Sequence, residues 1–231
     1  LTMVVELDEK ESVHIRTILS YYMEFKRLTL HFEERYNTTF PPAVIGTRDA
    51  LDHLMRSFQV KMGMNGSIPK DKESEYVISN LIASQNHIYR AMFELLDVMT
   101  AINRKKITDI VSEYSNETLT VHIPLYYAEI RQFLILMEKK VEDYRRLKDI
   151  ANIDMDDVDA YIEEVKKLEN YATYVESCVP QMAEYEKESK RMISQNLTAI
   201  EHELNSSRRL NYVLGALTVI SLLFAVFGFL G

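Results

Sequence analysis

The C-terminal segment LNYVLGALTVISLLFAVFGFLG, from Leu210 to Gly231, contains no charged residue. A helix rises about 1.5 Å per residue, so roughly 20 residues cover the ~30 Å hydrocarbon thickness of a bilayer. Arg208 and Arg209 directly precede the segment, and arginine beside a span favours the cytoplasmic side. We therefore predict a tail-anchored membrane protein with one transmembrane helix over 210–231 and a cytoplasmic N-terminal domain. A buried core helix is the alternative, but the segment has no polar stripe.

The composition of the whole chain favours a helical fold with a buried core. The sequence is 47% hydrophobic and 27% charged, and its 6 Gly and 5 Pro in 231 residues are too few for the turns of a sandwich or barrel. The single cysteine, Cys178, cannot form an intrachain disulfide. The net charge of -8 argues against a surface that coats nucleic acid, so any RNA contact is expected to be local. We predict an all-α, multi-helix bundle and expect no secretion signal at the N-terminus.

Apolar residues spaced by three and four predict several amphipathic helices. The first covers 9–37 and ends at NTTFPP, because proline cannot continue a helix. A second is expected to begin at Thr47 as its N-cap, and others are expected over 72–114 and from Pro124 to about 150. The expected core face of the first helix is Ile15, Ile18, Leu19, Tyr22 and Met23, and that of the second is Leu51, Leu54, Met55, Phe58 and Met62. The stretch SNETLTVHIP alternates as a short strand or loop would.

The sequence predicts three parts: a helical bundle over 1–150, a long helix or stalk over 151–209, and the membrane anchor over 210–231. The middle part repeats apolar residues every seven positions, at Val158, Val165, Ala172, Val179, Ile193 and Ile200. This repeat is typical of a coiled-coil seam between copies of the chain, which is one interpretation. We favour a helix packed on the bundle, because Glu186 interrupts the repeat and Pro180 favours a kink. We also expect the chain to form a homo-oligomer.

The segment GTRDALDHLMRSF contains Arg48, Asp49 and His53 in the pattern R-D-x-x-x-H. In these residues the sequence resembles the HEPN superfamily, all-helical domains found in many toxin and antiviral ribonucleases, with residues 9–150 as a loose helical context. The resemblance implies an endoribonuclease that uses His53 to move a proton and Arg48 to hold phosphate charge. It also implies that two chains pair their motifs, that RNA is the substrate, and that neither a metal nor another cofactor is needed.

Other interpretations of these residues stay open. Asp49 and His53 also suit a solvated helix face, where residues four apart interact. The segment SQNHIYRAMFELLD places His87, Arg90 and Glu94 on one side of another helix, where they either complete a pocket with Arg48 and His53 or contain an ordinary bundle histidine. A calcium-like spacing at 152–163 lacks the glycine that its turn needs, so we expect no metal site there. The alternative function is a non-catalytic membrane protein that oligomerises to scaffold partners or perturb the bilayer.

Overall fold

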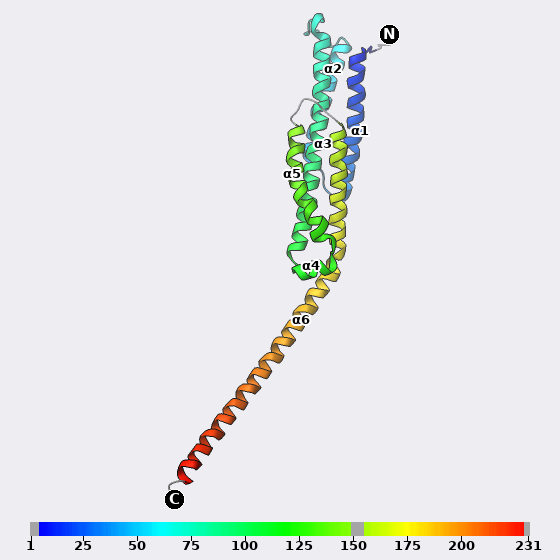
Figure 1. Cartoon of the computed structure of the whole chain (residues 1–231). Helices are drawn as coiled ribbons and strands as arrows, with labels where there is room; N and C mark the ends of the chain where they lie inside the picture. The colour runs from blue at the N-terminus through cyan, green and yellow to red at the C-terminus, as the bar shows by residue number, and fades with distance from the viewer. Residues whose placement is uncertain (1–4, 149–154, 229–231) are drawn as a thin grey trace. The chain divides into compact units, whose positions relative to one another are not determined.

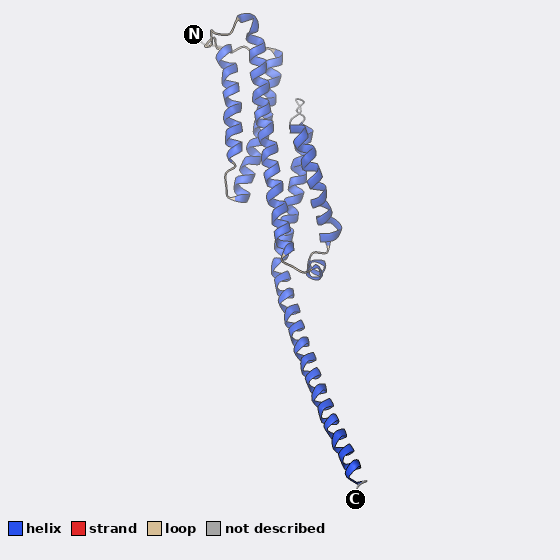
Figure 2. Ribbon diagram, turned by 90° about the vertical axis from the view of Figure 1, so that its left-hand side faces the viewer, coloured by secondary structure: helices blue, strands red, loops and turns tan. Residues whose placement is uncertain are grey.

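The computed structural model of the chain describes residues 5–148 and 155–228, and it leaves the side chains of 147, 148 and 219–228 undescribed. Within these residues all regular structure is helical, which confirms the predicted all-α class (Figure 1 and Figure 2). The elements are α1 (Glu9–Tyr36), α2 (Pro41–Lys61), η1 (Lys70–Lys72), α3 (Glu73–Ser112), α4 (Asn116–His122), η2 (Tyr126–Ile130), α5 (Arg131–Lys148) and α6 (Met155–Gly228). They form two compact units, one containing 1–113 and 124–177 and the other 114–123 and 178–231.

Helix α1 has the predicted bounds because both of its ends are capped. The Asp8 carboxylate accepts a hydrogen bond of 2.8 Å from the Glu11 amide, and the Glu11 carboxylate accepts one of 2.9 Å from the Asp8 amide. This capping box satisfies donors that the first turn leaves free. At the other end Asn37 adopts the left-handed conformation, with φ of 49°, which ends the helix before the two prolines.

The core face of α1 differs from the predicted one. The buried apolar residues are Ile18, Tyr21, Phe25, Leu28 and Phe32, which form their own stripe of alternating three- and four-residue spacing. The predicted Leu19, Tyr22 and Met23 are exposed. Two apolar stripes therefore run along α1, and only packing against α3 decides which one is buried.

Helix α2 begins earlier than predicted, at Pro41 instead of after Thr47. Proline is tolerated in the first turn because the amides there have no intrahelical acceptor. Thr47 consequently lies inside the helix, where its hydroxyl donates to the Ala43 carbonyl at 2.8 Å. The predicted core face was also wrong, since Leu51, Met55 and Met62 are exposed, whereas the buried residues of α2 are Ala43, Ala50, Ser57 and Val60.

Helix α3 is the central element of the first unit, and α1, α2 and α5 pack against it (Figure 1). It continues through 103–106 without interruption. The first part of α6 joins this unit through tyrosines: Tyr161 donates to Asp97 at 2.9 Å and stacks on Tyr144, with ring centroids 4.1 Å apart. Val158, Val165 and Ala172 are buried, so this part of the seven-residue repeat packs within the chain.

The second unit contains α4 and the rest of α6. The predicted strand-like stretch is the helix α4, whose N-cap Ser115 accepts from the Thr118 amide at 3.2 Å. Glu186 of α6 accepts from the Ser115 amide at 2.9 Å and from the Thr118 hydroxyl at 2.7 Å. These hydrogen bonds lower the pKa of Glu186 to about 2. A carboxylate at a helix N-terminus also complements the helix dipole.

Helix α6 runs on past Pro180 without interruption. Every residue from 190 to 218 is exposed, including Ile193 and Ile200 of the seven-residue repeat. A search of the described residues finds no helix with enough apolar length to cross a bilayer. The predicted transmembrane segment 210–231 falls largely outside that search, because the side chains of 219–228 and all of 229–231 lie beyond the described residues.

Candidate functional site

Small residues on α2 bring the motif helix close to α3. Ala43, Gly46, Ala50 and Ser57 follow one stripe of α2, and His53 lies on the same stripe. A Cβ atom placed on Gly46 would lie only 2.7 Å from the Cβ of Ala91 on α3, which shows how closely the two backbones approach. His53 therefore faces α3 and is half-buried.

His53 is held by a hydrogen bond to α3. Its Nδ1 lies 2.9 Å from Oδ1 of Asn80, whose Nδ2 donates to the Tyr76 carbonyl at 2.9 Å. Because Oδ1 of Asn80 can only accept, the neutral His53 ring carries its proton on Nδ1 and donates it there. The Nε2 atom is left with its lone pair, as a proton acceptor needs.

A second histidine, His87 of α3, lies against His53. The rings of His53 and His87 stack with centroids 5.2 Å apart and planes inclined by 20°. Burial lowers the pKa of His87, and the neighbouring His53 lowers it further, whereas Asp49 opposes both effects. This shift favours the neutral form of the His87 ring.

Arg48 lies beside this pair but does not line it. Its side chain is 71% exposed, and Nε and Nη2 donate to Oδ1 of Asp49 at 2.9 and 2.7 Å. The hydrogen bond from Arg48 lowers the pKa of Asp49, and His87 and His53 contribute in the same direction. Asp49 thus connects the guanidinium of Arg48 electrostatically to both histidines.

An open groove of about 300 Å³ lies between α2 and α3 at this point. Its lining includes Asp49, His87, Arg90 and Glu94, so both helices contribute to it, and a shared polar pocket was one of the two interpretations of these residues. Arg48 and His53 are not among the lining residues. The predicted membrane-flanking Arg208 and Arg209 belong to the other unit, on exposed positions of α6. The structure therefore brings Asp49, His53, His87 and Arg90 together and leaves Arg48 at the periphery.

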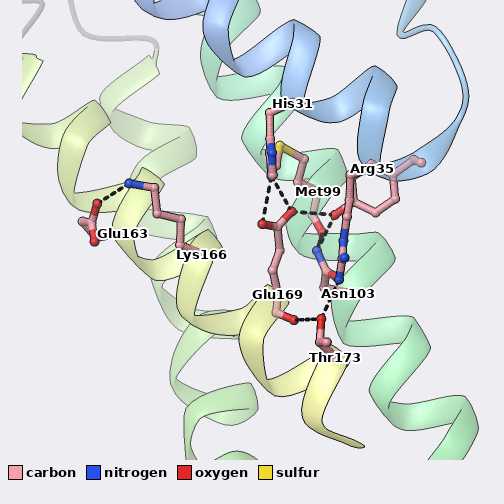
Figure 3. Close-up of polar contacts among 9 residues, drawn as sticks. His31, Arg35, Met99, Asn103, Glu163, Lys166, Glu169 and Thr173 are labelled. Carbon is pink, nitrogen blue, oxygen red and sulfur yellow. Dashed lines mark hydrogen bonds and ion pairs between the residues drawn. The ribbon is translucent and has the colours of Figure 1, made fainter. Parts of the chain in front are cut away.

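The structure also contains a polar cluster that the sequence did not reveal (Figure 3). His31 of α1 points at Glu169 of α6, with its Nε2 3.0 Å from one carboxylate oxygen, and Tyr36 donates to the other oxygen at 3.0 Å. Asn103 of α3 donates to the Tyr36 hydroxyl at 2.6 Å. Glu169 has a side chain only 10% exposed. Three helices thus meet around one buried carboxylate.

This cluster stabilises the packing of the helices and does not have the features of a reactive centre. Every oxygen of Glu169 has a donor, and Arg35 extends the contact by donating to Thr173 at 2.6 Å (Figure 3). Burial raises the pKa of Tyr36, and the negative Glu169 raises it further, so the phenol stays protonated. The sequence signals were Asn103, where the apolar stripe weakens, and Glu169, a charged residue beside the buried Leu168. Neither residue could be assigned to a cluster from the sequence alone, because the sequence does not show which helices are neighbours.

No set of three or more metal-ligating side chains gathers among the described residues. The calcium-like spacing at 152–163 begins outside them, and its described part opens α6. Comparisons of the chain with protein-family models, with curated proteins and with solved structures find no match. The resemblance to HEPN domains therefore rests on Arg48, Asp49 and His53 alone.

Proposed function

We propose that the chain is a metal-independent endoribonuclease of HEPN-like type, carried on a membrane and acting in antiviral defence or a toxin system. The observation that carries the catalytic part is the hydrogen bond from His53 to Asn80. It fixes the tautomer that leaves Nε2 able to accept a proton. The resemblance at Arg48, Asp49 and His53 supplies the substrate class and the cellular role.

In the proposed reaction, the ribose 2′-hydroxyl attacks the neighbouring phosphate and so cleaves the RNA backbone. His53 accepts the hydroxyl proton, the 2′-oxygen forms a bond to phosphorus, and the bond to the 5′-oxygen breaks. The leaving 5′-oxygen takes a proton from water, which the open groove admits, and the hydroxide that remains takes the proton back from His53. The products are a 2′,3′-cyclic phosphate and a 5′-hydroxyl. Arg48 and Arg90 hold the developing negative charge on the phosphate oxygens.

Two features of the site support this assignment of roles. The exposed guanidinium of Arg48 is reached by a phosphate from solvent, and Asp49 restricts its position. His87 stacks on His53 with ring centroids 5.2 Å apart and so restricts the orientation of the His53 ring. The chain's net charge of -8 makes the arginines the local attraction for an anionic substrate.

The test measures cleavage of single-stranded RNA by the purified full chain in the presence of EDTA. We expect His53→Ala to lower the rate about 10²- to 10⁴-fold, the usual contribution of a general base. His202→Ala is the matched control, because His202 lies exposed on α6 and its replacement is expected to leave the rate unchanged. Equal rates for the wild type and His53→Ala refute the catalytic role.

We also propose that residues 210–231 anchor the chain in a bilayer, with the rest of the chain on the cytoplasmic side. The support is the charge-free length of this segment and the pair Arg208 and Arg209 before it. Deletion after Arg209 is expected to move the protein from the membrane fraction to the soluble fraction of cells. Retention in the membrane fraction contradicts the anchor.

A non-catalytic membrane protein is the second candidate. The observation that favours it is the exposed apolar face of α6, which suits assembly with other chains. The two functions differ in one cellular result. Toxicity that survives His53→Ala but disappears on deletion of 210–231 assigns the effect to the bilayer or to a scaffold, whereas loss with either change assigns it to the ribonuclease.

A further inference from the structure

The exposed part of α6 carries a regular apolar face. Ile193, Leu197, Ile200 and Leu204 are 52–60% exposed. Their spacing alternates between four and three residues, which places them on one side of the helix. Such a face is stable in water when another helix covers it. We name these four residues the α6 seam.

The α6 seam differs from the N-terminal part of α6, where the apolar residues are buried within the chain. Val165, Leu168 and Ala172 are almost inaccessible to solvent, and Met182 is the last fully buried residue in the part of α6 whose side chains are described. The apolar face of α6 over residues 190–218 therefore does not contribute to packing within this chain, because all of these residues are exposed.

We propose that the α6 seam is the contact between copies of this chain, which associate as a parallel, four-stranded coiled coil. In heptad terms Leu197 and Leu204 occupy a positions, and Ile193 and Ile200 occupy d positions. Leucine at a with isoleucine at d favours tetramers over dimers, because the shapes of these side chains fit the holes of a four-stranded core.

Charge complementarity supports a parallel arrangement of identical chains. In this register Glu203 is at g and Arg208 is at the following e position. These are the positions that form ion pairs between neighbouring parallel helices. Every adjacent pair of helices would then contribute a contact between Glu203 and Arg208. A parallel arrangement also directs residues 210–231 of all copies to one side, which rests on the proposed membrane anchor.

The same register continues through the sequence into the anchor segment. After Leu204 the a and d positions fall on small or polar residues, apart from Leu214, and these are Ser207, Asn211, Thr218, Ser221, Ala225 and Gly228. Small and hydroxyl residues mark helix contacts in lipid, where large apolar side chains give no advantage over the lipid tails. In the sequence, the a and d positions therefore change from large apolar residues before Ser207 to mostly small residues in the apolar segment.

The test determines the mass of the full chain in detergent micelles by native mass spectrometry. We expect the mass of four chains for the wild type and loss of the tetramer for Ile200→Glu. Met192→Glu is the matched control, because Met192 is 62% exposed, close to the 60% of Ile200, but lies off the seam. Both positions are exposed, so neither change threatens the fold.

Cysteine cross-linking tests the parallel register. In a Cys178→Ala background, Leu204→Cys is expected to form disulfide-linked dimers within the assembly, and Asn205→Cys, one residue off the seam, is not. A monomeric or dimeric wild type, a tetramer that survives Ile200→Glu, or equal cross-linking at 204 and 205 overturns the proposal. These results are independent of RNA cleavage, so the failure of one proposal leaves the other standing.

Discussion

Replacement of Gly46 tests how the site is assembled, because this residue sets the distance between α2 and α3. A Cβ on Gly46 would lie 2.7 Å from the Cβ of Ala91 and 3.4 Å from the His87 carbonyl oxygen. Carbon atoms pack best at about 3.5–4.0 Å, so the two helices would have to separate by about 1 Å. That shift would act directly on the hydrogen bond between His53 and Asn80.

Two opposing effects determine the size of the change. Overpacking a close contact costs about 1–3 kcal/mol, whereas replacing glycine inside a helix stabilises it by about 1 kcal/mol. For Gly46→Ala the net destabilisation is therefore about 0–2 kcal/mol. Gly46→Leu brings three more carbons against α3 and reaches the upper end of the cost, so a net loss of about 2 kcal/mol is expected. In a chain of this size that loss lowers Tm by about 4–8 °C.

The assay follows thermal unfolding of the purified full chain by circular dichroism, together with the rate of RNA cleavage. Gly66→Ala is the control, because a Cβ on Gly66 has no neighbour within 4 Å. We expect this control to leave Tm unchanged or slightly raised. A Gly46→Leu variant that melts at or above the wild-type temperature refutes the close approach of α2 and α3.

Three further predictions concern other parts of the chain. Glu169→Ala removes the acceptor for His31 and Tyr36 and is expected to cost about 1–3 kcal/mol, measured by urea unfolding, and a loss smaller than that of Glu169→Gln contradicts this role. The lowered pKa of Glu186 means that its contribution to stability is present above its ordinary pKa of 4.5 and is lost as pH falls towards 2. The NMR shift of the Ser115 amide is therefore expected to titrate near 2, and a midpoint near 4.5 refutes the contact. Gly63, with φ of 65°, is expected to cost about 1–2 kcal/mol on replacement by alanine, and an unchanged Tm contradicts the strain.

The sequence predicted the helical class and the bounds of α1 because these depend on local chemistry. The acidic residue Asp8 and the residues after Tyr36 define the ends of α1 within a few positions. The start of α2 was predicted wrongly because Pro41 suits a first helical turn as well as it ends the preceding helix. The strand-like alternation of 115–123 was misleading, because the helix α4 is stabilised by Glu186, far away in the sequence.

The faces of the helices could not be predicted from periodicity alone. On α1 the residues Leu19 and Tyr22 form as regular a stripe as Tyr21 and Phe25 do, and only the second stripe is buried. On α2 the large residues point away from α3, because close packing uses Ala43, Gly46 and Ala50. A prediction from the size and hydrophobicity of the side chains therefore chose a face that is mostly exposed in the structure.

Only part of the candidate site could be predicted, because spacing within one helix does not show how two helices are aligned with each other. The motif identified Asp49 and His53, and the spacing of His87 and Arg90 suggested a second wall that the structure places beside them. Asn80 carried no signal in the sequence, since its role follows from the register between α2 and α3. The position of Arg48 outside the groove likewise depends on its pairing with Asp49.

The most direct test of the proposed activity compares an RNA oligonucleotide with the same sequence carrying 2′-deoxyribose. The purified full chain is incubated with each in EDTA, and the product ends are identified by mass spectrometry. We expect a 2′,3′-cyclic phosphate from the RNA and no cleavage of the deoxyribose analogue, because that analogue lacks the hydroxyl from which His53 takes a proton. Cleavage of both oligonucleotides, or of neither, contradicts it.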